Sequence, residues 1–230
     1  MTDLLLLVPT PTELRVLEPR LQLRVQQVGG TLHLCGFGPV AAAARTSQLI
    51  AKFTPARIIL VGIAGAIGDS LSVGSASVFD EVACFGIGAG SGEDFRTASD
   101  LGWSQWDSGR GQSNEGGSTI GDVLPLLSAQ AGSSADEHSE PRQLLTCCSA
   151  SGSPGDVALK ARHFPDAVAE DMEAFGVAMA ASLMAVPVQV VRGISNTAGD
   201  RQLSNWKIDE ALEAAAEVVL NLIAGNNAAG

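Results

Sequence analysis

The sequence predicts a single α/β domain of three layers (α/β/α), built on a central twisted sheet that is mixed but largely parallel. Two observations lead to this fold class. Short apolar runs typical of buried strands alternate with helical patterns, and hydrophobic residues make up 46% of the chain against 17% charged residues. Such a composition can bury a sizeable core, which argues against disorder. The 230 residues suit one domain over residues 1–230, and two small domains are the less favoured alternative.

The first half of the chain predicts two buried strands with a helix between them. Residues 4–8 are an unbroken apolar run ended by prolines, which is typical of a strand buried on both faces. An Ala-rich stretch begins at Pro39, a residue favoured at the first position of a helix. The elements in order are a strand over 4–8, strand-like pieces over 22–37 with a hairpin turn at Gly29-Gly30, a helix over 39–52 and a strand over 57–61.

The second half predicts three strands, a partly buried helix and a tail helix. The strands cover residues 75–84, 143–149 and 187–194, and the last is a β-branched run that Pro187 opens and polar loop residues follow. A helix begins at Asp171, with an apolar face formed by Met172, Phe175, Met179 and Leu183. The tail predicts an amphipathic helix that packs through Ile208, Leu212, Ala216, Val219 and Ile223.

A long segment over residues 86–121 is dominated by Gly, Ser and Asp, with Trp103 and Trp106 embedded in it. Loops of more than about 15 residues are usually functional or mobile. The segment is therefore expected to be either a lid over a ligand or part of a subunit interface, and both alternatives stay open.

The charge of the chain excludes a nucleic-acid partner. The net charge is −11 with a pI near 4.6, whereas phosphate backbones need clustered Lys and Arg. A small neutral or weakly charged ligand fits better. No apolar stretch reaches the roughly 18 residues of a membrane helix, and the N-terminal apolar run is short and lacks a basic flank. We therefore expect no membrane partner and no signal peptide.

The cysteine, histidine and glycine patterns argue against disulfides, a metal site and a nucleotide cofactor. The four cysteines give neither a disulfide framework nor paired metal-ligand spacing, so free thiols in a cytoplasmic protein are expected. No metal is expected, because the three histidines, His33, His138 and His163, are scattered. The glycines after the strand over 57–61 follow neither the dinucleotide spacing nor a Walker loop, so no cofactor is expected.

Four polar side chains stand where a ligand of an open α/β sheet is held, at or near the carboxyl ends of strands. Glu13 follows the first strand and either starts a surface helix or points into a cleft. Glu173 lies at a helix start, where a carboxylate also gains from the helix dipole. Ser195 and Asn196 follow the strand over 187–194, although Asn is ordinarily a turn former there.

The motifs Met172-Glu173 and Ser195-Asn196, with Val-Gly-Ile-Ala-Gly over residues 61–65, resemble the purine nucleoside phosphorylase and methylthioadenosine nucleosidase superfamily. The resemblance runs from Leu4 to about Ile223 and weakens through the Gly/Ser-rich middle. Within the superfamily the chain is similar to the futalosine hydrolases, nucleosidases of an alternative route to menaquinone. The resemblance implies an enzyme, a small nucleoside as partner, no cofactor and a homo-oligomer.

The resemblance also implies a role for each candidate. Glu173 would accept hydrogen bonds from the ribose hydroxyls, Glu13 would orient and deprotonate the attacking water, and Asn196 would face the leaving base. Further substrate contacts are implied for Ala64, Gly65, Ser149, Ala150, Met172, Ser195 and Trp206.

Two residues bear on the reaction type. Relatives usually carry Ser or Thr where this chain has Ile63, and an apolar side chain cannot bind phosphate, so water is the expected nucleophile. Adenine-specific relatives carry Asp where this chain has Asn196, and an amide, with both a donor and an acceptor, suits a 6-oxopurine such as hypoxanthine. The alternatives are a phosphorylase or adenine-specific nucleosidase, and a nucleoside-binding module without catalysis.

Overall fold

The computed structural model describes residues 2–107, 119–127 and 142–225, and every structural statement below concerns these residues. Their main sheet has nine strands, and seven of them form the path β2-β1-β3-β10-β9-β5-β8. Strand β11 pairs with β3 and with β4. The strands of this sheet are β1 (Thr2–Val8), β2 (Thr31–Leu34), β3 (Pro55–Ala66), β4 (Ala76–Phe79), β5 (Glu81–Phe85), β8 (Val123–Pro125), β9 (Gln143–Cys147), β10 (Ala167–Asp171) and β11 (Val188–Thr197).

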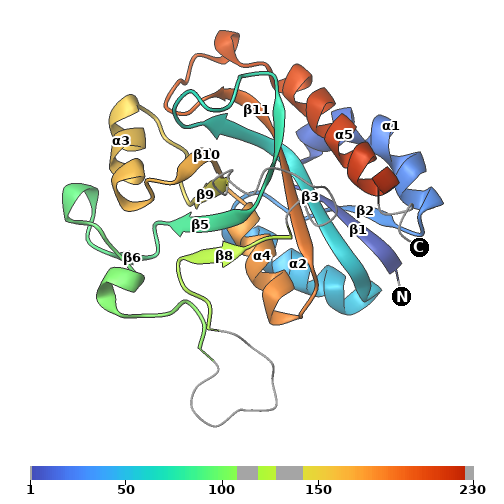
Figure 1. Cartoon of the computed structure of the whole chain (residues 1–230), viewed down its shortest axis with the longest axis horizontal. Coiled ribbons are helices and arrows are strands. Elements are labelled where there is room, and N and C mark those ends of the chain that lie inside the picture. The colour runs from blue at the N-terminus through green and yellow to red at the C-terminus, as the bar shows by residue number, and fades with distance from the viewer. Residues whose placement is uncertain (1, 108–118, 128–141, 226–230) are drawn as a thin grey trace.

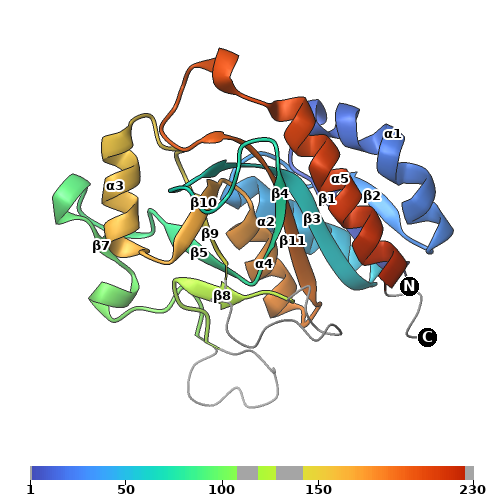
Figure 2. The same ribbon diagram turned by 45° about the horizontal axis from the view of Figure 1, so that its top comes forward.

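Helices cover both faces of the sheet, which confirms the predicted three-layer α/β fold with a mixed, largely parallel sheet (Figure 1). One core lies between the sheet and α2 with α4, and a second lies between the sheet and α1 with α5. Figure 2, turned by 45°, shows α1 and α5 side by side and α3 set apart near β9 and β10. The helices are α1 (Pro11–Gln27), α2 (Pro39–Phe53), α3 (Pro154–His163), α4 (Ala174–Leu183) and α5 (Ile208–Gly225).

Strand β3 is the centre of the sheet and positions the site. Along one edge it pairs in parallel with β11, and along the other it pairs first with β1 and then, at its end, with β10. At that end Gly65 is paired with Glu170 of β10 and with Asn196 of β11. The ends of β1, β3, β10 and β11 therefore meet at one place.

The prediction of strand-like pieces over residues 22–37 was wrong in its first part. Residues up to Gln27 continue α1, which begins with a capping box between Thr10 and Glu13 and has Pro11 in its first turn. The glycines at 29–30 join this helix to β2, which runs parallel to β1, so they do not form a hairpin. Burial of Leu17, Leu21 and Val25 at four-residue spacing stabilises the helix through tertiary packing.

Several other boundaries also differ. The strand expected over 75–84 is divided at Asp80 into β4 and β5. Asp171 ends strand β10 instead of starting a helix, and α4 begins at Ala174. Helix α4 is buried nearly all round, whereas Leu183, expected on its apolar face, is 43% exposed. Ser195 and Asn196 lie inside β11, with an irregularity in its register beside them, and not in the loop that was expected.

The remaining predicted elements agree with the structure. The buried strands over 4–8 and 57–61 lie inside β1 and β3, and the strand over 143–149 corresponds to β9. The helix over 39–52 corresponds to α2, and the tail helix α5 buries Leu212, Ala216, Val219 and Ile223 as expected.

The described part of the 86–121 segment contains a small two-stranded sheet, β6 (Gly88–Ala89) with β7 (Arg96–Thr97), and the short helices η1 (Gly92–Asp94) and η2 (Ser99–Leu101). Phe95 is buried there against Phe85 of β5. Trp103 is 75% exposed. Residues 108–118 of the segment lie outside the described part of the chain.

Candidate active site

A cavity of about 360 Å³ opens where β1, β3, β10 and β11 end. Its volume lies within the range of small-molecule sites, roughly 300–1,000 Å³. Nine of the ten residues predicted from the sequence line it: Glu13, Ala64, Gly65, Ala150, Met172, Glu173, Ser195, Asn196 and Trp206. The tenth, Ser149, is exposed outside the lining, and its carbonyl oxygen accepts a hydrogen bond from Lys160. The roles predicted for these residues stay predictions.

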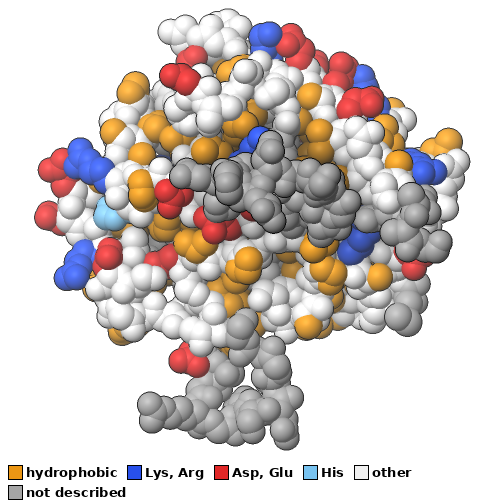
Figure 3. Space-filling view, in the orientation of Figure 1, with side chains coloured by type: hydrophobic (Ala, Val, Ile, Leu, Met, Phe, Trp, Pro, Cys, Tyr) orange, Lys and Arg blue, Asp and Glu red, His pale blue; other side chains and the backbone are white. Residues whose placement is uncertain are grey.

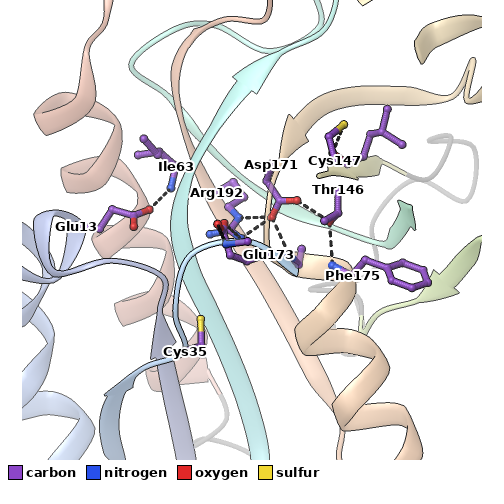
Figure 4. Close-up of polar contacts among 12 residues, drawn as sticks. Glu13, Cys35, Ile63, Thr146, Cys147, Asp171, Glu173, Phe175 and Arg192 are labelled. Carbon is purple, nitrogen blue, oxygen red and sulfur yellow. Dashed lines mark hydrogen bonds and ion pairs between the residues drawn. The ribbon is translucent and has the colours of Figure 1, made fainter. Parts of the chain in front are cut away.

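Glu13 both caps α1 and faces the cavity, so the two interpretations of this residue are compatible. Its Oε2 accepts hydrogen bonds from the Thr10 backbone N–H at 3.0 Å and from the Thr10 hydroxyl at 2.5 Å. Its Oε1 accepts one from the Ile63 N–H at 3.0 Å. Helix α1 and strand β3 thus hold a buried carboxylate, 5% exposed, in a fixed position on the cavity wall (Figure 4).

Arg192, in the middle of β11, is fully buried and connects the acidic residues of this wall (Figure 4). Its Nη2 lies 2.5 Å from Asp171 Oδ2 and 3.5 Å from Glu173 Oε2, and its Nε donates to Asp171 Oδ2 at 3.1 Å. Asp171 is itself held by the Thr146 hydroxyl at 2.6 Å and by the Ala174 N–H at 2.9 Å. Such a network fixes the guanidinium in one orientation.

Glu173 stands at the N-cap of α4, but its side chain does not cap the helix. Instead, its Oε1 accepts a hydrogen bond from the Gly38 N–H at 3.0 Å, and its Oε2 faces Arg192. Gly38 has φ = +84°, a backbone conformation that favours glycine. The carboxylate is therefore aimed into the cavity by a turn before α2 and by a buried cation.

The charges of this wall act on one another. Burial raises the pKa of the Glu173 carboxyl to about 7; the Arg192 guanidinium opposes the shift and the Asp171 carboxylate adds to it. Burial also lowers the pKa of Arg192, but the carboxylates of Asp171, Glu173 and Glu13 outweigh it and leave that pKa raised. The guanidinium thus stays charged, and Glu173 titrates near neutral pH.

Gly62 of β3 allows the carboxylate of Glu13 and the guanidinium to approach each other. A Cβ at this position would lie 2.3 Å from Arg192 Nη1 and 2.6 Å from Glu13 Oε1, both closer than atoms can pack. Nη1 is buried and has no hydrogen-bond partner among the described residues. Because buried donors are normally paired, this N–H beside a carboxylate suits a small polar ligand such as water.

Asn196 and Ser195 of β11 provide neutral polar groups to the lining of the cavity. The Asn196 Oδ1 accepts from the Ser195 hydroxyl at 2.8 Å, and its Nδ2 donates to the Thr197 carbonyl at 2.8 Å. An amide has two donor hydrogens and two acceptor lone pairs, so one of each stays available for a ligand.

A second buried ion pair adjoins the same cavity. Lys160 Nζ of α3 lies 3.0 Å from Glu170 Oε2 of β10, and each residue is 5% exposed. Ser151 donates to this carboxylate from its backbone N–H at 2.8 Å and from its hydroxyl at 2.7 Å. Glu170 also lines the cavity.

Sequence reasoning missed Arg192, Glu170 and Lys160. A signal existed for Arg192, because a charged residue inside a β-branched run has to be buried and therefore paired. Glu170 and Lys160 gave no comparable signal, since β10 and α3 were not predicted. Trp206 also lines the cavity; its Nε1 donates to the Asp200 carbonyl at 3.1 Å and its ring packs against Arg201.

Metal-dependent and thiol-based chemistry find little support in the described part of the chain. Within it, no group of three or more His, Cys, Asp or Glu could hold a metal ion, and His138 lies outside it. Burial raises the pKa of the Cys35 thiol, near Arg192, to about 12, so this thiol is neutral and a poor nucleophile.

No helix of the described residues is long and apolar enough to cross a membrane. On the face shown in Figure 3, described Lys and Arg side chains are scattered among acidic ones.

Comparisons of the sequence with known proteins agree over most of the chain. The family model described as the Phosphorylase superfamily matches residues 23–224. A futalosine hydrolase from Streptomyces coelicolor is 32% identical over 209 residues, which cover 89% of this chain and 83% of that protein. A 5'-methylthioadenosine/S-adenosylhomocysteine nucleosidase from Lysinibacillus sphaericus is 30% identical over 196 residues, covering 82% and 78%.

Solved structures share the fold. The native structure of futalosine hydrolase from Helicobacter pylori matches with a TM-score of 0.72 at 15% identity, covering 97% of this chain and 98% of that chain. A 5'-methylthioadenosine/S-adenosylhomocysteine nucleosidase from Neisseria meningitidis, in complex with methylthio-immucillin-A, matches with a TM-score of 0.70 at 18% identity, covering 97% and 99%.

Proposed function

The chain belongs to the phosphorylase superfamily, and from this premise we propose how it acts as a futalosine hydrolase. It is an N-glycosyl hydrolase, which releases hypoxanthine from futalosine and leaves dehypoxanthine futalosine, a step of menaquinone biosynthesis. The observation that carries the proposal is the common cavity lined by Glu13, Glu173 and Asn196, with Arg192 between the two glutamates.

Glu173 is proposed to bind the sugar. Cleavage of an N-glycosidic bond places positive charge on the ribose ring, along an oxocarbenium-like path comparable to glycoside hydrolysis. A carboxylate that accepts hydrogen bonds from the 2′- and 3′-hydroxyls favours this charge more in the transition state than in the ground state. Its contact with the Gly38 N–H and its ion pair with Arg192 support such fixed positioning.

Glu13 is proposed to act on the attacking water. The carboxylate accepts a proton from the water as the oxygen bonds to C1′ and the bond from C1′ to the base nitrogen breaks. The unpartnered Nη1 of Arg192, close to Glu13 Oε1, supports a water position between the two groups. The apolar side chain of Ile63 lines the same wall, which supports water rather than phosphate as the nucleophile.

Asn196 is proposed to hold the leaving base. The bond electrons pass to the purine, and hydrogen bonds to its edge stabilise the negative charge that develops there. The free donor of the Asn196 amide matches N7 and O6 of a 6-oxopurine, which are both acceptors. Around the base and sugar, we propose contacts from Ala64, Gly65, Ala150, Met172 and Ser195, with Trp206 at the outer end.

One assay tests the proposed reaction. Purified protein is incubated with futalosine, inosine, adenosine and methylthioadenosine, with and without phosphate, and the released base is identified by chromatography. We expect hypoxanthine from futalosine at a rate that does not depend on phosphate. Release of adenine without hypoxanthine would contradict the 6-oxopurine assignment, and a requirement for phosphate would contradict hydrolysis.

We also propose that the protein is a cytoplasmic homo-oligomer with one domain. All four cysteines are free, which supports a reducing compartment. Phe37, at the cavity, is 66% exposed and Val40 is 82% exposed, which supports an apolar contact with a second copy. None of the described residues of the 86–121 segment lines the cavity, and its exposed Trp103 supports an interface rather than a lid. Light scattering on the purified protein tests the oligomer.

A further inference from the structure

Glu170 lies directly across Gly65 from Asn196. Both residues are paired with Gly65, one on each edge of β3, and directly paired residues project their side chains to the same face of a sheet. Two strand spacings separate the Cα atoms of Glu170 and Asn196 by about 10 Å. Glu170 and Asn196 both line the cavity, so a carboxylate and a carboxamide border a common space. A separation of this size between the two strands suits a flat heterocycle with a hydrogen bond at each edge.

The carboxylate of Glu170 is held in place by hydrogen-bond donors of Lys160 and Ser151. Its Oε2 accepts from Lys160 Nζ at 3.0 Å and from the Ser151 hydroxyl at 2.7 Å, and its Oε1 accepts from the Ser151 N–H at 2.8 Å. Lys160 also donates to the Ser149 carbonyl at 2.8 Å. An ionised carboxyl group offers about four acceptor positions, so Oε1 keeps acceptor capacity towards the cavity that Glu170 lines.

Stability alone gives little reason for this ion pair. Taking two charges out of water costs more than their attraction usually returns, and well-packed apolar residues often serve as well or better. Another role is therefore needed to explain the pair, and the place of Glu170 in the lining of a ligand cavity points to recognition.

We propose that Glu170 determines the base specificity of the site by accepting a hydrogen bond from the ring N–H of a 6-oxopurine, opposite Asn196. This inference rests on the proposed function. A 6-oxopurine carries a hydrogen on N1, whereas a 6-aminopurine presents a lone pair there, which a carboxylate repels. Lys160 and Ser151 are positioning residues that keep the carboxylate at this edge.

The test compares a 6-oxo with a 6-amino nucleoside, using futalosine and its 6-amino analogue. In Glu170→Gln the charged acceptor is replaced by an amide that also offers a donor. We expect the ratio of kcat/KM, 6-oxo over 6-amino, to fall at least about tenfold, as expected when a charge-assisted hydrogen bond is lost. The matched control is Glu81→Gln, a carboxylate of β5 that accepts from Gln143 outside the cavity lining, and it should keep the wild-type ratio.

A second variant is needed because Glu170→Gln leaves Lys160 buried without a counter-charge, which could destabilise the fold. In the double variant Lys160→Met with Glu170→Gln no unpaired charge remains, and the ratio should fall as in the single variant. A parallel loss for both nucleosides would mean that the ion pair only supports the loop at 149–151, and it would overturn the proposal. A rise in the ratio would overturn it too, because Glu170 would then face the 6-amino group.

Binding of free bases tests the same point without turnover. By calorimetry, the wild-type protein should bind hypoxanthine at least about tenfold more tightly than 1-methylhypoxanthine, which lacks the N1 hydrogen, and Glu170→Gln should remove most of that difference. Equal affinities of the wild type for the two bases would overturn the proposal. Failure of the wild type to hydrolyse any nucleoside would instead overturn the proposed function, while the binding comparison still decides the role of Glu170.

Discussion

The two ends of the cavity are each built around a buried cation, but their charge balance differs. At the end that we propose binds the sugar, here called the sugar end, Arg192 is surrounded by the carboxylates of Asp171, Glu173 and Glu13. At the end that we propose binds the base, here called the base end, Lys160 is paired with Glu170. The other polar group there is the neutral amide of Asn196. With every carboxyl group ionised, the sugar end is net negative and the base end is net neutral.

This difference matches what each end has to do. The sugar ring becomes positive during cleavage, so an excess of negative charge at its end stabilises the transition state. The base has to be identified by its pattern of donors and acceptors, and a balanced pair can fix such a pattern without a net field. Changes at the sugar end should therefore lower the rates of all nucleosides alike, and changes at the base end should alter the ratio between them.

The largest effect is expected for Glu173→Gln. The amide keeps an acceptor for the Gly38 N–H but removes the negative charge that faces the sugar. Loss of such a transition-state contact costs on the order of 10²–10³-fold in kcat/KM. The loss should be the same for futalosine and its 6-amino analogue in a steady-state assay. A variant with near-wild-type rate would contradict the ribose role, and the exposed Glu93→Gln serves as the control.

A smaller loss, roughly 10²-fold, is expected for Arg192→Lys. Lysine retains the charge, but its single ammonium cannot reach Asp171 and Glu173 and also present an N–H beside Glu13 as the planar guanidinium does. The substrate ratio should stay unchanged. Circular dichroism would establish that the fold is intact, and Arg45→Lys, on the surface of α2 where Arg45 contacts Gln48, is the matched control. Full activity of Arg192→Lys would show that the guanidinium only supports the fold.

The two ends also differ in how far their residues could be predicted from the sequence. Glu13, Glu173 and Asn196 stand next to apolar strands or helix starts with clear local patterns, so their convergence at one edge of the sheet could be predicted. Arg192 could have been found, since a lone charge within the run Val-Val-Arg-Gly-Ile of β11 requires a buried partner. Its partner Asp171 was assigned to a helix, which concealed the pair.

Glu170 at the base end could not be predicted from the sequence, for a different reason. Strand β10 reads Ala-Val-Ala-Glu-Asp, and its two acidic residues break the apolar pattern by which a buried strand is identified. Only pairing with β9 and β3 makes it a strand, and that pairing brings Glu170 opposite Asn196. Local patterns cannot show contacts that depend on residues far apart in the chain. The last turns of α1 were also predicted wrongly, because their residues are strand-like. Thr10, Pro11 and Glu13 nevertheless form a recognisable helix start.

At the base end, Asn196→Asp should change the ratio of substrates by roughly tenfold while the better substrate keeps most of its rate. A carboxylate accepts from the exocyclic amine of a 6-aminopurine and repels the O6 oxygen of a 6-oxopurine. Separate kcat/KM values for futalosine and its 6-amino analogue measure the change, and the exposed Asn221→Asp is the control. An unchanged ratio would mean that the base is recognised elsewhere, and an equal loss for both nucleosides would contradict the distinction between the two ends.

The smallest effect expected concerns pH. Because the pKa of Glu173 is raised to about 7, the fraction of Glu173 that is ionised in the wild type falls about tenfold between pH 8 and pH 6. The value of kcat/KM should fall with it. Glu173→Gln should lose this limb of the profile.

The raised pKa of Glu173 also makes the stability of the fold depend on pH. Between the usual pKa of 4.5 and about 7, the folded state binds the proton on Glu173 more tightly than the unfolded state does. The resulting stabilisation is fully present below pH 4.5 and is lost as the pH rises through 7. Relative to Glu173→Gln, the wild type should therefore lose stability between pH 5 and pH 8, by on the order of 3 kcal/mol for a shift of this size. Urea unfolding of both proteins at these two pH values measures the difference. A difference that does not change with pH would mean that Glu173 is already ionised at pH 5, and the fall in activity would then belong to another group of the sugar end.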